Sequence, residues 1–109
     1  MNATETIANF IATTRAQDIP EHVFALAKRN LIDTLGVAIG AAGSAVDGAL
    51  RKLAPANHTG EANLWNGRGR AAAMEAVWMN GALAHALDFD DGGVALTPMH
   101  PSSPVLPAV

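Results

Sequence analysis

The sequence contains no cysteine, and this absence restricts the chemistry available to its 109 residues. Without thiols the segment forms no disulfide, offers no thiolate nucleophile and does not ligate an iron–sulfur cluster through cysteine. Aromatic residues are scarce at 5%, yet half of the residues are apolar and alanine is abundant among them. A core of this composition packs helices closely through small side chains.

Basic residues are too few to suggest a surface that binds nucleic acid. Lys and Arg number 7 against 10 Asp and Glu, which gives a net charge of −3 and a pI near 5.7, whereas nucleic-acid-binding domains usually carry a basic patch or stripe. The longest uncharged run, from Thr34 to Val46, is too short to span a bilayer, which takes about 20 residues. The N-terminus lacks the basic and apolar regions of a secretory signal. We therefore expect a soluble, cytoplasmic protein with no nucleic-acid or membrane partner.

Apolar residues recur at spacings of three and four along most of the chain, which predicts a single all-α domain. In the clearest helix, Leu31, Leu35 and Ala38 belong to one apolar stripe, while Lys28 and Asp33 lie off it. The predicted helices cover residues 4–14, 20–43, 44–55 and 71–87, and a fifth begins at 102–103 and is cut short by the end of the chain.

Several helix ends are predicted from local residue types. The expected N-caps are side chains that accept a backbone N–H, namely Thr4, Ser44 and either Ser102 or Ser103. Pro20 falls near the first position of its helix, where its missing N–H costs nothing, and Gly43 is expected to end that helix. Gly36 and Gly40 each weaken the same helix by about 1 kcal/mol relative to alanine. We expect the close approach of a neighbouring helix to compensate for them.

The segment between the third and fourth predicted helices carries turn residues. Residues 61–65 are expected to form a short extended piece before a turn at Asn66-Gly67. Arg68-Gly69-Arg70 follows, but it lacks the glycine spacing of a phosphate-binding loop. An exposed basic turn is therefore the favoured interpretation, ahead of an anion site.

The strongest functional signal is a group of ionisable residues in the otherwise apolar and Gly/Pro-rich segment 80–107. Its members are two histidines and three carboxylates: His85, Asp88, Asp90, Asp91 and His100. They lie at the end of the predicted helix 71–87 and in the loop after it, where catalytic groups are often found. If helical geometry continues, His85, Asp88 and Asp91 share a face. If the chain is extended, Asp88 and Asp90 point the same way. Both arrangements place two carboxylates close together, which would raise the pKa of one.

Other interpretations of these residues are open. His85 on an apolar helix face fits a core histidine that bonds to Asp88. The segment His100-Pro101-Ser102-Ser103 fits a capping turn. Histidine and aspartate also suit zinc or another divalent cation. The sequence has neither an HExxH pattern nor an Asp-x-Asp-x-Asp-Gly loop, so we predict no metal site.

Three segments resemble, in this order, the opening of the MmgE/PrpD family: IPEHVFALAKRNLIDTLGVAIG, MNGALAHALDFDD and HPSSPVLPAV. That family includes 2-methylcitrate dehydratase, cis-aconitate decarboxylase and iminodisuccinate epimerase. Its members are much longer and combine a large helical domain with a smaller α/β lid domain. The resemblance implies that residues 1–109 form part of the N-terminal helical domain, with about five helices, and that the full-length form is a homodimer.

The resemblance also implies roles for individual residues. Asp88 and His100 would line the active site, with His100 as the acid–base group and Asp88 orienting it or a substrate hydroxyl. The family commonly has threonine where this chain has Gly92, so we expect Thr97 to take its place in binding substrate, together with Asp91. The shared reaction step is proton abstraction beside a carboxylate of a small di- or tricarboxylic acid, without a cofactor. Bare carboxylates repel such a substrate, so the remaining acids must point away, pair with cations or carry a proton.

A function of another class is a non-catalytic, truncated helical module that only packs against a partner chain. A contact surface needs no His–Asp cluster, so the cluster favours a 2-methylcitrate dehydratase-like lyase. The family's remaining active-site histidine and lysines fall beyond Val109, which favours an inactive fragment. Dehydration, decarboxylation and epimerisation all stay open as the reaction.

Overall fold

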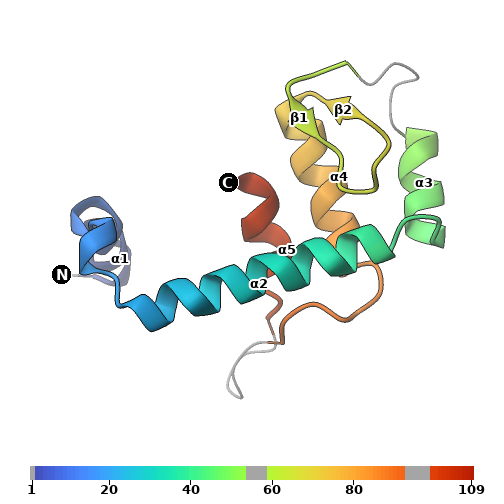
Figure 1. Cartoon of the computed structure of the whole chain (residues 1–109). Coiled ribbons are helices and arrows are strands. Elements are labelled where there is room, and N and C mark those ends of the chain that lie inside the picture. Colours follow the sequence, from blue (N-terminus) through green and yellow to red (C-terminus); the bar gives the residue numbers. More distant parts are fainter. Residues whose placement is uncertain (1, 54–58, 93–98) are drawn as a thin grey trace.

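A computed structural model describes residues 2–53, 59–92 and 99–109. These residues are mostly helical, as the sequence predicted, with five α-helices and one small hairpin (Figure 1). The α-helices are α1 (Ala3–Thr13), α2 (Glu21–Gly40), α3 (Ala45–Leu53), α4 (Ala73–His85) and α5 (Ser102–Val105). Single 3₁₀ turns lie at η1 (Ala16–Asp18) and η2 (Leu106–Ala108), and the hairpin strands are β1 (Ala62–Asn63) and β2 (Arg70–Ala71).

The N-terminus of α1 differs from the prediction. Asn2, not Thr4, is the N-cap, because Asn2 and Glu5 bond reciprocally: the Asn2 side chain accepts the Glu5 N–H at 2.9 Å, and the Glu5 carboxylate accepts the Asn2 N–H at 3.1 Å. This capping box needs an acid or amide three residues after the cap. Three residues after Thr4 stands Ile7, which offers no such group.

The ends of α2 and the start of α3 follow local chemistry closely. Pro20 is the N-cap of α2, next to its predicted place, while the helix ends at Gly40, three residues before Gly43. Gly43 has a positive φ of 87° in the turn after the helix, a conformation that glycine adopts without strain. Ser44 caps α3 as predicted, since its hydroxyl accepts the Asp47 N–H at 3.2 Å.

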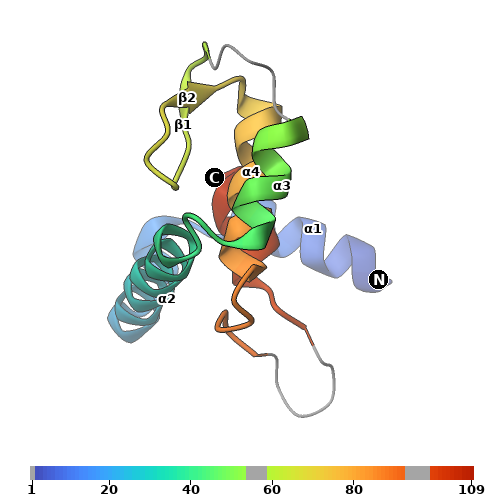
Figure 2. The same ribbon diagram turned by 90° about the vertical axis from the view of Figure 1, so that its right-hand side faces the viewer.

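The hairpin was predicted only in part. The expected extended piece at 61–65 contains β1, but the pairing with β2 was not foreseen, because two-residue strands are too short to show an alternating pattern. Asn63 pairs with Arg70 in antiparallel register, and positive φ angles at Gly67 and Gly69 allow the tight connection between them. The basic turn therefore closes a hairpin, which is packed against the N-terminal half of α4 (Figures 1 and 2).

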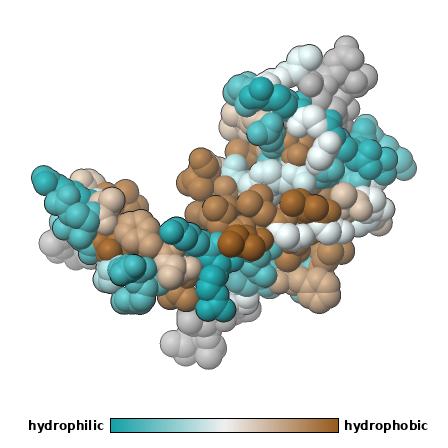
Figure 3. All heavy atoms as spheres, viewed as in Figure 1, coloured by the Kyte–Doolittle hydropathy of each residue, from teal (hydrophilic) through white to brown (hydrophobic). Residues whose placement is uncertain are grey.

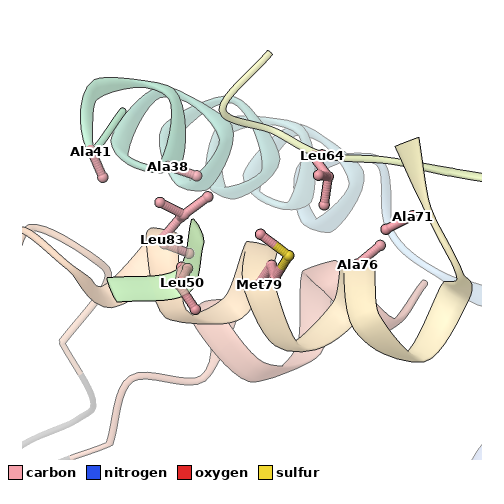
Figure 4. Close-up of a cluster of buried hydrophobic side chains, with 9 residues drawn as sticks. Ala38, Ala41, Leu50, Leu64, Ala71, Ala76, Met79 and Leu83 are labelled. Atoms are coloured by element: carbon pink, nitrogen blue, oxygen red, sulfur yellow. The ribbon is translucent and has the colours of Figure 1, made fainter. Parts of the chain in front are cut away.

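The core lies where α2 crosses α4, beside α3 and the hairpin (Figure 4). Its buried apolar side chains are Ala38, Ala41, Leu50, Leu64, Ala71, Ala76, Met79, Leu83 and Ala84. The prediction of a small-residue core is confirmed, but that of close helix contacts at Gly36 and Gly40 is wrong among the described residues. A Cβ at Gly36 would meet no atom within 4 Å, and one at Gly40 would only touch the Leu87 side chain at 3.8 Å.

Large apolar side chains of α1 and α2 are exposed. In Figure 1 α1 and the first half of α2 extend away from the body that the other elements form, and Ile11 and Ile32 are each 70% exposed. Figure 3 shows hydrophobic side chains gathered around the middle of α2 and around the C-terminal end of the chain. In the described residues no single helix is long and apolar enough to cross a membrane; α2 and α3, bent at 80°, meet the length and composition only as a pair.

Candidate functional site

Helix α4 carries the first histidine of the site at its C-terminal end. Val77, Trp78, Gly81, Ala82 and His85 of α4 line one side of a groove. His100, Ser103 and Pro104 line the other side. The groove is therefore apolar along most of its length and ends at the two histidines.

The chain reverses just after α4, at Asp88. This residue has a φ of 55°, in the left-handed region, and its N–H bonds to the His85 carbonyl at 3.1 Å. Aspartate is one of the few non-glycine residues that tolerate this conformation. The turn ends the helix and brings Asp90 back against His85.

Asp90 is the buried centre of the cluster. Its side chain has no exposed surface, whereas the side chains of His85 and His100 are 54% and 38% exposed. His85 Nδ1 lies 3.0 Å from each carboxylate oxygen of Asp90. His100 Nδ1 lies 3.4 Å from Oδ2 without forming a hydrogen bond, and this buried nitrogen has no hydrogen-bond partner among the described residues.

The contacts of Asp90 keep it ionised. Burial by itself raises the pKa of this carboxyl, but the hydrogen bonds from His85, from the Ser103 side chain and from its own backbone N–H outweigh burial. The pKa of Asp90 therefore lies below its ordinary value of 3.8. The expected rise in pKa between neighbouring carboxylates does not occur at Asp90, because its nearest ionisable partners are imidazoles.

Asp91 turns away from the histidines. Its carboxylate accepts the Ser102 N–H at 3.1 Å and the Ser102 hydroxyl at 2.7 Å. The start of α5 is therefore held by a side chain from eleven residues upstream, and the predicted capping by Ser102 or Ser103 is wrong: Pro101 is the N-cap residue, and no cap bond comes from its side chain.

The structure brings together two of the four site residues that the sequence predicted. Asp88 and His100 offer ligand atoms that lie, with those of His85 and Asp90, within 4.8 Å of one another. Asp91 lies apart on Ser102, and Thr97 falls outside the described residues. Asp88 and Asp90 lie close together, but through a left-handed turn at Asp88, and neither the continued helix nor the extended chain considered from the sequence is observed.

The contact between His85 and Asp90 was missed. The predicted partner of His85 was Asp88, and its predicted place was the helix core; both are wrong, because the ring is half exposed and bonds to Asp90. Residue spacing does not reveal this contact, because it depends on the backbone turn at Asp88.

The four side chains could hold a divalent ion by donor type and separation, since imidazole nitrogen and carboxylate oxygen are common zinc ligands. Their present arrangement is that of a hydrogen-bonded pair, with His85 Nδ1 equidistant from both oxygens of Asp90 at 3.0 Å. A tetrahedral zinc site would require each of these atoms to turn toward the ion at about 2.0–2.2 Å.

The arginines of the hairpin are engaged elsewhere. Arg68 Nη2 lies 3.4 Å from Oδ2 of the buried Asp47, and Arg70 Nη2 donates to the Glu61 carbonyl. The first contact joins the hairpin turn to α3, and the second lies within the hairpin itself. This arrangement is consistent with a structural turn.

Fold and site together define a mainly helical domain with a histidine–carboxylate cluster. Residues 5–109 match the MmgE/PrpD N-terminal domain, and the chain belongs to this family. No curated protein and no solved structure matches the chain.

Proposed function

We propose that this chain supplies one side of the active site of an MmgE/PrpD lyase that resembles 2-methylcitrate dehydratase. The lyase would act on a small di- or tricarboxylic acid by abstracting a proton from the carbon beside a carboxylate. The observation that supports this proposal is that a ring nitrogen of His100 and a carboxylate oxygen of Asp88 lie within 4.8 Å of each other and of the buried Asp90 carboxylate, and that His100 lines a groove.

His100 is the proposed acid–base group. Its ring lines the groove and is 38% exposed, so a substrate can reach it. Asp88 is exposed and is held at the cluster by the left-handed turn, which suits a residue that orients His100 or a substrate hydroxyl. Thr97 and Asp91 keep the substrate-binding roles proposed from the resemblance; Asp91 would act through Ser102, which its carboxylate holds.

The charges of the site require cations from elsewhere. The segment from His85 to His100 contains three carboxylates and neither Lys nor Arg. Abstraction beside a carboxylate adds negative charge to a substrate that already carries two or three, so donors or cations must stabilise the transition state. We therefore propose that residues outside 1–109 complete the site, and that the 109-residue chain alone has no measurable turnover.

Exchange of the substrate proton with solvent tests this function without prior choice of the reaction. The 109-residue chain and a form extended by the coding sequence after codon 109 are incubated in D₂O with 2-methylcitrate, cis-aconitate and iminodisuccinate, and deuterium incorporation and products are followed by NMR. The extended form should exchange or convert one of these acids. His100→Asn should lower its kcat by about 10²–10⁴-fold, the usual contribution of a positioned acid–base group.

His22→Asn is the matched control, because His22 is an exposed histidine in the first turn of α2. It should leave kcat unchanged. An extended form that neither exchanges nor converts any of these acids would favour the non-catalytic helical module. Turnover by the 109-residue chain itself, abolished by His100→Asn, would show that the missing residues do not supply the charge.

A further inference from the structure

One carboxylate faces two imidazoles in this site. Asp90 is the described residue that forms ion-pair contacts with His85 and His100, and in both rings the facing atom is Nδ1, at 3.0 Å and 3.4 Å. The rings are tilted by 57° with centroids 4.9 Å apart, so they are close without stacking.

A buried carboxylate controls which nitrogen of a neighbouring neutral imidazole carries the proton. An ionised carboxylate only accepts hydrogen bonds, so the nitrogen that faces it must donate. Asp90 has no exposed side-chain surface, and its contacts keep it ionised. Water therefore does not compete for its lone pairs as it would at an exposed carboxylate.

We propose that Asp90 is the positioning residue of the site, which fixes the Nδ1–H tautomer of both His85 and His100 and leaves each Nε2 free for the groove. The catalytic meaning of this role rests on the function proposed for His100; the tautomers themselves do not. Of the two roles given to Asp88, orienting His100 then falls to Asp90, and the exposed carboxylate of Asp88 orients a substrate hydroxyl.

The orphaned Nδ1 of His100 supports this assignment. This nitrogen is buried and lies 3.4 Å from Asp90 Oδ2 without a hydrogen bond. A small rotation of the ring would complete the bond to the same oxygen that His85 contacts. When His100 takes a proton on Nε2, the imidazolium faces the Asp90 carboxylate, which stabilises its charge. This is the arrangement by which a buried aspartate orients a catalytic histidine in Ser–His–Asp sites.

The tautomers can be measured directly in the form extended beyond codon 109, and this measurement does not depend on activity. Long-range ¹H–¹⁵N correlation spectra of the ¹⁵N-labelled chain, recorded with EDTA at a pH where the imidazoles are neutral, distinguish Nδ1–H from Nε2–H in each ring. We expect Nδ1–H in His85 and His100. Asp90→Asn replaces one acceptor oxygen with a donating NH₂ group, so at least one of the two rings should change to Nε2–H.

Asp91→Asn is the matched control, because it removes a carboxylate one residue away that bonds to Ser102 and not to the histidines. It should leave both rings as Nδ1–H. Nε2–H in both rings of the unsubstituted chain would overturn the proposal, and this test needs no variant to fold. If the rings are Nδ1–H in EDTA and Nε2–H appears only after Zn²⁺ is added, the tautomer assignment is supported. This result would also show that an ion can displace the Nδ1 proton.

The longer enzyme tests the catalytic part separately. Asp90→Asn should lower kcat by about 10²-fold or more with a smaller effect on KM, since it changes the proton-bearing nitrogen rather than the groove. Asp90→Glu, which keeps the charge and both acceptors, should restore part of kcat. If the tautomers are as expected but the longer enzyme is inactive on every acid tested, the proposed function fails and the positioning role stands. Unchanged kcat in Asp90→Asn of an active longer enzyme would overturn the positioning role of Asp90.

Discussion

Asp88 decides the direction of the chain after α4, and with it the composition of the site. A helical residue at this position would have continued the helix and placed Asp88 itself beside His85, because residues three and four positions apart are neighbours on a helix. The φ of 55° at Asp88 breaks that continuity and places Asp90 there instead. One backbone torsion angle thus selects which of the later carboxylates meets the histidines.

The left-handed conformation of Asp88 predicts a conflict between stability and function. Asp88→Gly should stabilise the turn after α4 by up to about 1–2 kcal/mol, because glycine adopts positive φ without the clash between Cβ and the following carbonyl oxygen. It should also lower kcat of the longer enzyme, since the carboxylate is lost. Amide hydrogen exchange in the last turn of α4 measures the first effect. Asp88→Asn, which tolerates the same backbone conformation, should lower kcat without raising protection, and greater protection in Asp88→Asn than in Asp88→Gly would contradict the strain argument.

Asp47 is a second buried carboxylate, with a structural role. It accepts hydrogen bonds from the Gly43 N–H at 2.8 Å and from Asn66 Nδ2 at 3.0 Å, and it also pairs with Arg68. Burial raises the pKa of Asp47, but the hydrogen bonds from Gly43 and Asn66 and the charges of Arg68 and Arg51 outweigh it, so the pKa lies below 3.8. The carboxylate joins the hairpin turn to the start of α3.

The lowered pKa of Asp47 predicts acid sensitivity in this region. A carboxyl with a lower pKa in the folded state stabilises that state above the unfolded pKa, and this contribution is lost as pH falls through the folded pKa. Protection of the Gly43 amide from hydrogen exchange should therefore decrease below about pH 3.8. Asp47→Asn should lower the free energy of opening that protects the Gly43 amide by about 1.5–3 kcal/mol at pH 7, the usual contribution of hydrogen bonds to charged groups. The difference in Gly43 protection between the unsubstituted chain and Asp47→Asn should narrow on acidification. A constant difference down to pH 2 would contradict the lowered pKa of Asp47.

At the scale of elements, α4 is the centre of the domain. Its buried residues include Met79, Leu83 and Asn80, and it contacts α2, α3, α5 and the hairpin. The opposite face lines the groove and leaves Trp78 49% exposed. A helix that is apolar on more than one face is typical of a position inside a larger core.

Asn80 fixes the hairpin on α4, and its removal has a local readout. Its Oδ1 accepts the Trp65 N–H at 2.9 Å and its Nδ2 donates to the Asn63 carbonyl at 3.0 Å. Asn80→Ala leaves both buried groups unsatisfied and should destabilise the hairpin by about 1–3 kcal/mol, measured by hydrogen exchange of the Trp65 amide. Asn80→Asp keeps the acceptor for Trp65 but places an oxygen opposite the Asn63 carbonyl, and should be no milder. Unchanged Trp65 protection in Asn80→Ala would contradict this anchoring role.

At the scale of the whole molecule, the described chain is extended and exposes apolar surface. Its radius of gyration is 16.0 Å, against about 13 Å for a compact domain of this length. Ile11, Ile32 and other large apolar side chains of α1 and α2 are exposed. Exposed apolar surface on this scale usually marks a contact with another segment or chain.

The isolated chain should therefore be helical but loosely packed or self-associating. Circular dichroism should show helix, thermal unfolding should be broad, and the sedimentation coefficient should rise with concentration. Ile32→Glu, on the exposed side of α2, should reduce association. A sharp, cooperative thermal transition in a monomer at low concentration would show that the 109 residues complete their own core.

The sequence by itself determined the elements whose contacts are local. Helix hydrogen bonds span four residues, so apolar periodicity was enough to locate α2 and α4, and a serine hydroxyl was enough to place the start of α3 at Ser44. The sequence also identified the group of residues that forms the site, because histidines and carboxylates stand out among Ala, Gly and Leu.

Only the tertiary structure decided which of these residues meet. The pairing of β1 with β2, the bond from Asp91 to Ser102 and the contact of His100 with Asp90 join residues about ten positions apart in the chain. Such contacts depend on how α2, α4 and α5 pack and on the turn at Asp88, and spacing along one helix or strand contains no information about either. For this reason the sequence assigned His85 to Asp88, whereas the folded chain gives both histidines to the buried carboxylate of Asp90.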